Sequence, residues 1–209
     1  MGIGALRCCV EYRLRQNASI PGEDIPVPDP FPGYVAPAAG TEAPLEMLAA
    51  CHGRVQRQCA TLKRLVAHVA AQGADAQAQS AAASVMRYFD TAAVHHHEDE
   101  EQDLFPALLE SMAGSDAVCI REITDGLVRD HRALEVAWRR VRATLVRIAA
   151  GENVALESAD VEALVGLYER HIEVEERELL PMAARLLDDD ELARIGRAMR
   201  ERRGIPDDA

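Results

Sequence analysis

Two stretches of the chain are close copies of one another: HHEDEEQDLFP at residues 96–106 and HIEVEERELLP at residues 171–181. Six of the eleven positions are identical, namely the first His, three Glu, the Leu and the Pro. Each copy begins with His-x-x-x-Glu, which on a helix places an imidazole and a carboxylate one turn apart on the same face. Two such pairs in one small chain supply donors for a metal site with mixed nitrogen and oxygen ligands.

The composition is that of a helical globular protein. The 209 residues are 48% hydrophobic and 28% charged, and only 4% are aromatic. Ala, Leu, Arg and Glu are abundant, which favours helix over sheet. The net charge of −12 argues against a nucleic-acid partner, because such a partner requires a basic face. No apolar run approaches the ~20 residues of a membrane span.

Cysteine usage and the N-terminus predict a cytoplasmic protein. The five cysteines are an odd number and form no C-x-x-C motif, so we expect a reducing compartment rather than a disulfide framework. The first 16 residues lack the apolar core and the cleavage site of a signal peptide. The adjacent Cys8 and Cys9 have no other Cys or His near them in the sequence, and we assign them no redox or metal role.

Proline content separates an N-terminal arm from the rest of the chain. Seven of the ten prolines lie within residues 21–44, so residues 1–43 are predicted to form an extended, Pro-rich arm. Four amphipathic helical patterns follow, at about residues 43–72, 74–112, 116–150 and 158–187, and then a short charged helix at about 189–202. We therefore predict an all-α protein. Residues 44–187 form an up-down-up-down four-helix bundle, and residues 188–209 form a short C-terminal helix and tail.

Two kinds of break are expected within these patterns. Pro106 and Pro181 lie inside helical stretches, and each is expected to kink or end its helix about one turn after the His-x-x-x-Glu pair. The segment Gly114-Ser115-Asp116 is expected to end the second helix and to cap the third.

Six polar side chains fall at inward positions of the four patterns, among Leu, Val, Ile and Phe. They are His52, His96, Glu100, His131, His171 and Glu175. A single inward His is more often a hydrogen-bonded core residue, and a single His-x-x-x-Glu is more often a helix-surface pair. Two unpartnered buried carboxylates, however, would threaten a fold with a stability of ~5–15 kcal/mol. The six can be divided into two sets of two His and one carboxylate, which suits iron and other first-row divalent metals.

At these positions the chain resembles the hemerythrin-like, or HHE cation-binding, domain family. The matching motifs are ACHGRV at 50–55, HHHEDEEQDLFP at 95–106, RDHRALE at 129–135 and RHIEVEERELLP at 170–181. The resemblance covers about residues 44–187 and implies a non-haem di-iron centre whose two Glu carboxylates bridge or cap the metals. The implied ligands are His52, His96, Glu100, His131, His171 and Glu175, and the implied cofactor is two iron ions, or another divalent metal.

The resemblance also implies a function. It predicts a metal-binding protein that binds or senses a small ligand such as oxygen, nitric oxide or peroxide, so its partners are metal ions and that ligand. The alternatives are a di-iron enzyme that handles peroxide or nitric oxide, and a metal store or iron-centre repair protein. No catalytic residue is assigned, because the sequence reveals no substrate pocket or proton relay.

For several residues near the proposed ligands the sequence allows more than one role. Oxygen-carrying hemerythrins have a fifth His where this chain has Glu135, which argues against reversible oxygen carriage. We expect Glu135 at the surface or behind the ligands, with an extra ligand as the alternative. His95 and His97 are expected at the rim of the site, unless the register is shifted so that His97 pairs with Glu101. Tyr168 is expected to pack, or to hydrogen-bond a ligand carboxylate.

An acidic run surrounds the first His-x-x-x-Glu pair. It consists of Glu98, Asp99, Glu101 and Asp103. Because helix surfaces commonly carry such charges, we expect this run to form a solvated face.

Overall fold

The computed structural model describes residues 40–111 and 116–206, and within these ranges it contains helices and no strands. The predicted all-α fold is confirmed. No helix in these ranges is long and apolar enough to cross a membrane. The predicted arm, including Cys8-Cys9, lies outside the described residues except for residues 40–43, as does the predicted break at Gly114-Ser115. The division of the chain into arm, bundle and C-terminal segment stays a prediction.

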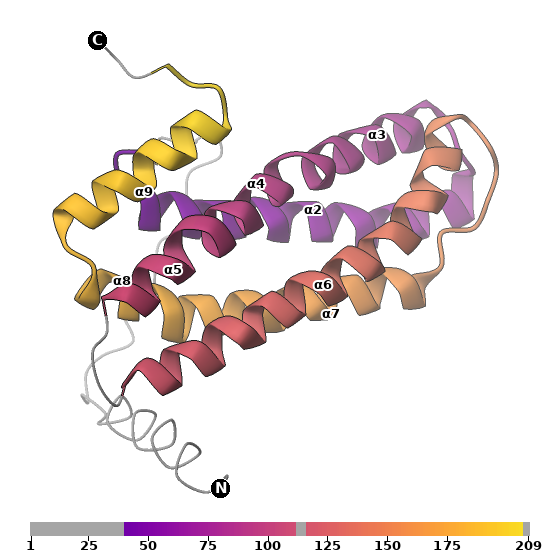
Figure 1. Ribbon diagram of the computed structural model, residues 1–209. Coiled ribbons are helices and arrows are strands. Elements are labelled where there is room, and N and C mark those ends of the chain that lie inside the picture. The colour runs from indigo at the N-terminus through magenta and orange to yellow at the C-terminus, as the bar shows by residue number, and fades with distance from the viewer. Residues whose placement is uncertain (1–39, 112–115, 207–209) are drawn as a thin grey trace, which may run out of the picture.

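Four helical segments run back and forth along one another to form a bundle (Figure 1). The first is α2 (Pro44–Gln72) and the third is α6 (Asp116–Ala149). The second comprises α3 (Ala76–Asp90), α4 (Ala92–Asp99), the π-helical turn η1 (Glu100–Leu104) and α5 (Phe105–Glu110). The fourth comprises α7 (Ser158–Val174), the π-helical turn η2 (Glu175–Leu179) and α8 (Leu180–Leu186). Both α2 and α6 pack against α3 and α7, as expected for up-down-up-down topology.

The second helix is interrupted at Thr91, which the sequence pattern did not predict. Thr91 has non-helical backbone angles, φ −129° and ψ −75°. Its hydroxyl donates a hydrogen bond to the Arg87 carbonyl at 2.6 Å, a bond that competes with the backbone and commonly bends helices. The break starts α4 immediately before the three consecutive His residues.

The two prolines neither end nor break their helices. Pro106 and Pro181 instead follow the π-helical turns η1 and η2 and lie at the beginning of α5 and α8. A proline has no N–H to donate and its ring clashes with the carbonyl four residues earlier. Widening the preceding turn relieves this clash, and such π turns occur frequently at functional sites. Each π turn begins at one of the two inward carboxylates, Glu100 and Glu175.

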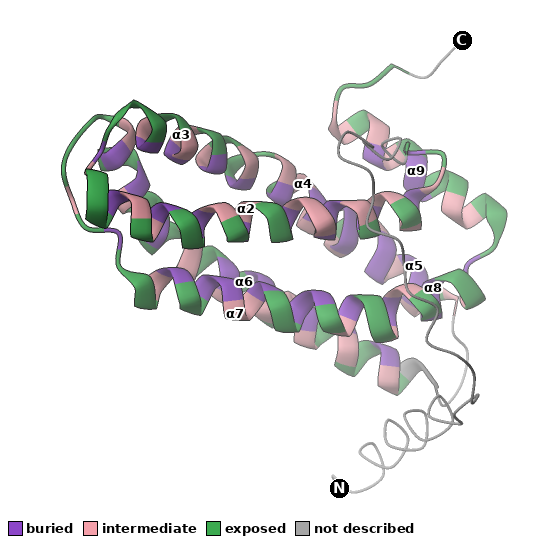
Figure 2. Cartoon of the chain, turned by 180° about the vertical axis from the view of Figure 1, so that it is seen from behind, coloured by how far each residue is buried: buried purple, intermediate pink, exposed green. Residues whose placement is uncertain are grey.

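The apolar core is divided into two clusters by a polar layer. One cluster includes Val55, Ala93 and Leu134, and the other includes Leu48, Leu104 and Leu127. Buried residues face the inside of the bundle along all four segments (Figure 2). Each helical segment passes from one cluster to the other within two or three turns, and the inward His and Glu residues occupy the turns between.

The short C-terminal helix α9 (Asp189–Arg202) lies across one end of the bundle and packs on α2, α4 and η1 (Figure 1). It begins with a capping box between Asp188 and Glu191. At its other end, Arg202 and Arg203 both bind Asp99, whose side chain is 1% exposed. The expectation of a solvated acidic face was therefore wrong for Asp99, because α9 covers it and supplies two guanidinium partners.

The neighbouring acids Glu98 and Asp99 differ in their surroundings, and this difference predicts different effects on stability. Replacing Asp99 by Ala leaves Arg203 without its carboxylate partner among the ion pairs seen, while Arg202 keeps Asp103 at 2.7 Å, so we expect a loss of about 2–3 kcal/mol in unfolding free energy. Glu98 is 38% exposed and lies 3.8 Å from the Arg202 Nε atom, so Glu98→Gln should cost less than about 1 kcal/mol. Urea denaturation of both variants measures this, and equally small losses would contradict the docking of α9 through Asp99.

Candidate metal centre

The six residues predicted from the sequence come together in the polar layer between the two apolar clusters. They come from all four helical segments: His52 from α2, His131 from α6, His96 with Glu100 from the second segment, and His171 with Glu175 from the fourth. All six are between 0 and 2% exposed. The inward placement predicted from the helical patterns is therefore what the structure has.

One group of four side chains gathers beside α2. The His52 Nε2 atom lies 3.0 Å from Glu175 Oε2, and the His96 Nε2 atom lies 3.4 Å from Glu100 Oε1. The two imidazole rings meet edge to face, with centroids 5.2 Å apart. One donor atom from each of the four residues lies within 4.8 Å of every other, as donors around a single ion do.

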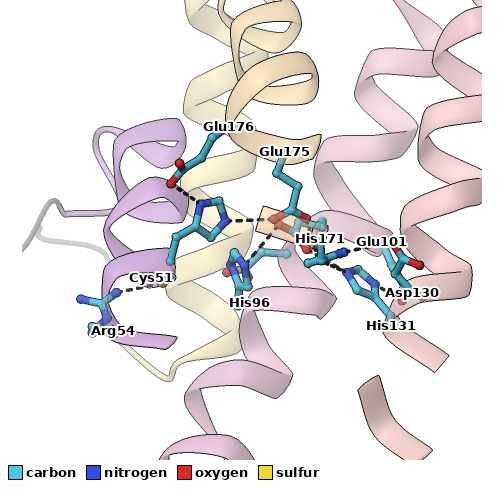
Figure 3. Close-up of polar contacts among 12 residues, drawn as sticks. Cys51, Arg54, His96, Glu101, Asp130, His131, His171, Glu175 and Glu176 are labelled. Carbon is cyan, nitrogen blue, oxygen red and sulfur yellow. Dashed lines mark hydrogen bonds and ion pairs between the residues drawn. The ribbon is translucent and has the colours of Figure 1, made fainter. Parts of the chain in front are cut away.

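A second group gathers beside α6 and uses the same two carboxylates. The His171 Nε2 atom lies 2.9 Å from Glu175 Oε1 (Figure 3). The His131 Nε2 atom lies 3.2 Å from Glu100 Oε2. The two Nε2 atoms are 3.2 Å apart. Donor atoms of these four residues also lie within 4.8 Å of one another.

Each carboxylate thus points one of its oxygens to the first imidazole pair and its other oxygen to the second pair. Glu175 directs Oε2 to His52 and Oε1 to His171, and Glu100 is divided in the same way between His96 and His131. The helical patterns suggested two sets with one carboxylate each, and the family resemblance implied carboxylates that bridge or cap the metals; in the structure both carboxylates are common to both sets. This arrangement suits two cations joined by two bridging carboxylates.

The electrostatics of the two carboxylates favour a bound cation. Burial, and then the neighbouring Glu175, raise the pKa of Glu100 well above its ordinary value. Burial also acts to raise the pKa of Glu175, but the adjacent imidazoles of His171 and His52 outweigh it and lower this pKa well below its ordinary value. Two carboxylates this close resist ionising together, and a divalent cation between their oxygens removes the repulsion.

The imidazole of His96 is also suited to binding a metal ion. Burial lowers the pKa of His96 to about 3, so this ring is neutral and keeps a nitrogen lone pair for coordination.

The hydrogen bonding of the layer fits a metal centre. Among the described residues, every buried side-chain nitrogen or oxygen without a hydrogen-bond partner belongs to this layer. Four of these atoms face the centre of the two groups: His52 Nε2, Glu100 Oε2 and both oxygens of Glu175. Leaving a buried polar atom unsatisfied costs about 1–3 kcal/mol. Coordination to cations would satisfy all four, so the residues present fit a two-metal site.

Two further glutamates orient the imidazoles from outside, and the sequence reading did not identify them. Glu176 Oε1 lies 3.1 Å from His52 Nδ1, and Glu101 Oε1 lies 2.7 Å from His131 Nδ1. A carboxylate on the outer nitrogen fixes the ring and leaves Nε2 for the metal. Burial acts to lower the pKa of His52, but Glu175 and Glu176 outweigh it and raise this pKa. The available signal was the Glu-Glu dipeptide, which occurs in both copies of the repeat.

Two acidic residues outside the centre can be compared with their expected positions. Glu101 differs from the expectation, and Glu135 agrees with it. Glu101 is 23% exposed and is held between His131 and Arg132, with Arg132 Nη2 at 2.5 Å, so it does not belong to a solvated face. Glu135 is half exposed and pairs with Arg132 at 2.6 Å. It therefore points away from the centre, in agreement with the expected role at the surface.

His97 is only partly buried, but its ring packs inward rather than pointing out at the rim. Its ring stacks on His131 at 4.0 Å between centroids, and its Nε2 atom is buried without a hydrogen-bond partner. Burial, together with the neighbouring His131, lowers the pKa of His97 well below its ordinary value. The alternative register, in which His97 would replace His96 beside Glu101, does not occur, because Glu101 binds His131 instead. His95 is 36% exposed and pairs with Glu98, as expected for the rim.

Comparison with known proteins agrees with this site. A model of the hemerythrin HHE cation binding domain matches residues 43–183, so the chain belongs to that family. An uncharacterized protein of Haemophilus influenzae is 30% identical over 162 residues, which cover 78% of this chain and 91% of that protein. The family and the clustered His and Glu side chains together identify a cation-binding domain.

The outer glutamates generate a prediction on metal affinity. Glu176→Gln removes the charge that orients His52, so we expect one of the bound cations to bind about 10–100-fold more weakly while the bundle stays folded. The measurement is anaerobic competition for Fe(II) with a chromophoric chelator. Glu173→Gln is the control, since Glu173 is 54% exposed and pairs only with Arg177 among the ion pairs seen. Equal affinities of the two variants would show that Glu176 does not support the site.

Proposed function

We propose that this protein binds two iron ions in a carboxylate-bridged, non-haem centre and uses it to bind or sense a small ligand such as oxygen, nitric oxide or peroxide. The proposed ligands are His52, His96, Glu100, His131, His171 and Glu175. The observation that carries the proposal is that Glu100 and Glu175 are shared: each places one carboxylate oxygen beside the first imidazole pair and the other oxygen beside the second pair.

The donor set supports iron. Each imidazole pair is accompanied by carboxylate oxygens, and no sulfur donor belongs to the described groups. Imidazole and carboxylate together suit non-haem iron, whereas thiolates favour zinc, copper(I) or iron–sulfur clusters. Iron in such a site supplies redox chemistry and a place for an exogenous ligand, while the chain holds the donors in position and keeps them dry.

The surroundings support a small ligand rather than a large substrate. Each proposed ion has four protein side chains, fewer than the six positions of octahedral coordination. A separate pocket of about 240 Å³ lies between α2 and α7, about one helical turn from His52 and His171; none of the six proposed ligands lines it, and its lining is mainly apolar, including Val55, Tyr168 and Ile172. This is below the usual size of pockets for drug-sized ligands. Tyr168 is 5% exposed and its ring packs near Phe89, with centroids 5.5 Å apart.

A cytoplasmic location is part of the proposal. The buried cysteines Cys51 and Cys59 form no disulfide, and burial raises the pKa of the Cys59 thiol to about 12, which keeps it protonated and inert. Both facts are compatible with a reducing compartment.

Anaerobic loading with Fe(II) tests the proposal. We expect two irons per chain and, after oxidation, near-ultraviolet charge-transfer absorption that changes with azide, peroxide or nitric oxide. Glu175→Ala should lose at least one iron and this absorption, because it removes an oxygen donor from both ions. Glu173→Ala is the control on the outer face of the same helix and should retain both irons.

Three outcomes would redirect the interpretation. A colourless protein that holds a single zinc ion would contradict the proposal. Sustained turnover of peroxide or nitric oxide would favour the di-iron enzyme, and reversible release of iron without response to small ligands would favour the metal store.

A further inference from the structure

His97 lies against the second imidazole pair, on the side of the polar layer nearest α6. Its ring is almost parallel to that of His131, at an angle of 14°, and it meets His171 edge to face with centroids 5.9 Å apart. One ring nitrogen of each of the three residues lies within 4.8 Å of the other two. The three imidazoles therefore form a third group of donors, spaced as closely as the two groups that include the carboxylates.

The Nε2 atom of His97 is inaccessible to water and has no hydrogen-bond partner. Buried polar atoms in proteins are nearly always paired with a protein group, a water or a metal ion. The neighbouring donors are themselves imidazoles of the proposed centre, so a cation held by that centre is a partner that all three nitrogens could share.

We propose that His97 is a fifth imidazole ligand, which binds the ion held by His131 and His171. This inference rests on the proposed two-ion function. The ion beside α6 then has three imidazoles and a share of two carboxylates, whereas the ion beside α2 has two imidazoles and the same share. The two ions then have different sets of protein ligands.

Coordination requires only a side-chain movement. Two parallel stacked rings cannot both point their lone pairs at one ion, so the His97 ring turns about its side-chain torsions when the ion binds. The backbone of α4 stays in place, because His96 on the same turn already faces the other ion. The alternative role for His97 is stacking on His131 without coordination.

Mössbauer spectroscopy of the protein loaded with two equivalents of ⁵⁷Fe distinguishes these roles. The wild type should show two doublets of equal area from two inequivalent irons. In His97→Ala one doublet should change and the other should keep its parameters, and one iron should bind about tenfold or more weakly. His95→Ala is the matched control from the same His run, because His95 is partly exposed and pairs with Glu98; both of its doublets should stay unchanged.

Chemical rescue separates ligand loss from a folding defect. In His97→Gly, added imidazole should restore the altered doublet if His97 is a ligand, and His97→Gln keeps the side-chain volume if the smaller variants do not fold. A His97→Gln protein with two irons and both doublets unchanged would overturn the inference and leave His97 as a packing residue. A wild type that does not bind two irons would instead refute the proposed function.

Discussion

The structure depends on how two buried carboxylates, Glu100 and Glu175, are neutralised inside the bundle. Both side chains are at most 1% exposed, and each lies within 3.4 Å of imidazole nitrogens from two different helical segments. Ionised carboxylates in such a place destabilise a fold unless cations or hydrogen bonds compensate them. A pair of metal ions would compensate both at once, which would couple the stability of the bundle to its proposed function.

The backbone is built around this constraint with approximate two-fold repetition. Each carboxylate is the first residue of a π-helical turn, and each turn is followed by a proline, Pro106 or Pro181. The residue after each carboxylate reaches across the bundle to orient a His on another segment: Glu101 supports His131, and Glu176 supports His52. The repeated sequence therefore supplies, in each copy, one imidazole, one carboxylate shared between the two imidazole pairs, and one orienting carboxylate. His97 and the α9 clamp on Asp99 occur in one half only and break this symmetry.

Helical periodicity predicted most of the fold and brought the six central residues to one place. It succeeded because an inward His or Glu interrupts an apolar stripe, and the interruption repeats on four helices. It failed where tertiary contacts decide. Asp99 and Glu101 have the composition of a solvated face, yet one is covered by α9 and the other is held by Arg132 and His131. His97 is about 100° from His96 around a helix, which predicts the rim, but its partly buried side chain packs inward on His131. The break at Thr91 depends on a local side-chain bond to the backbone that no apolar pattern reveals.

Anomalous diffraction at the iron absorption edge, from crystals of the iron-loaded protein, would locate the ions relative to the two carboxylates. We expect two anomalous peaks between the four helical segments, one near His52 and His96 and the other near His131 and His171, with Glu100 and Glu175 contacting both. A single peak, or two peaks of which one does not contact both carboxylates, would contradict the proposed two-ion centre.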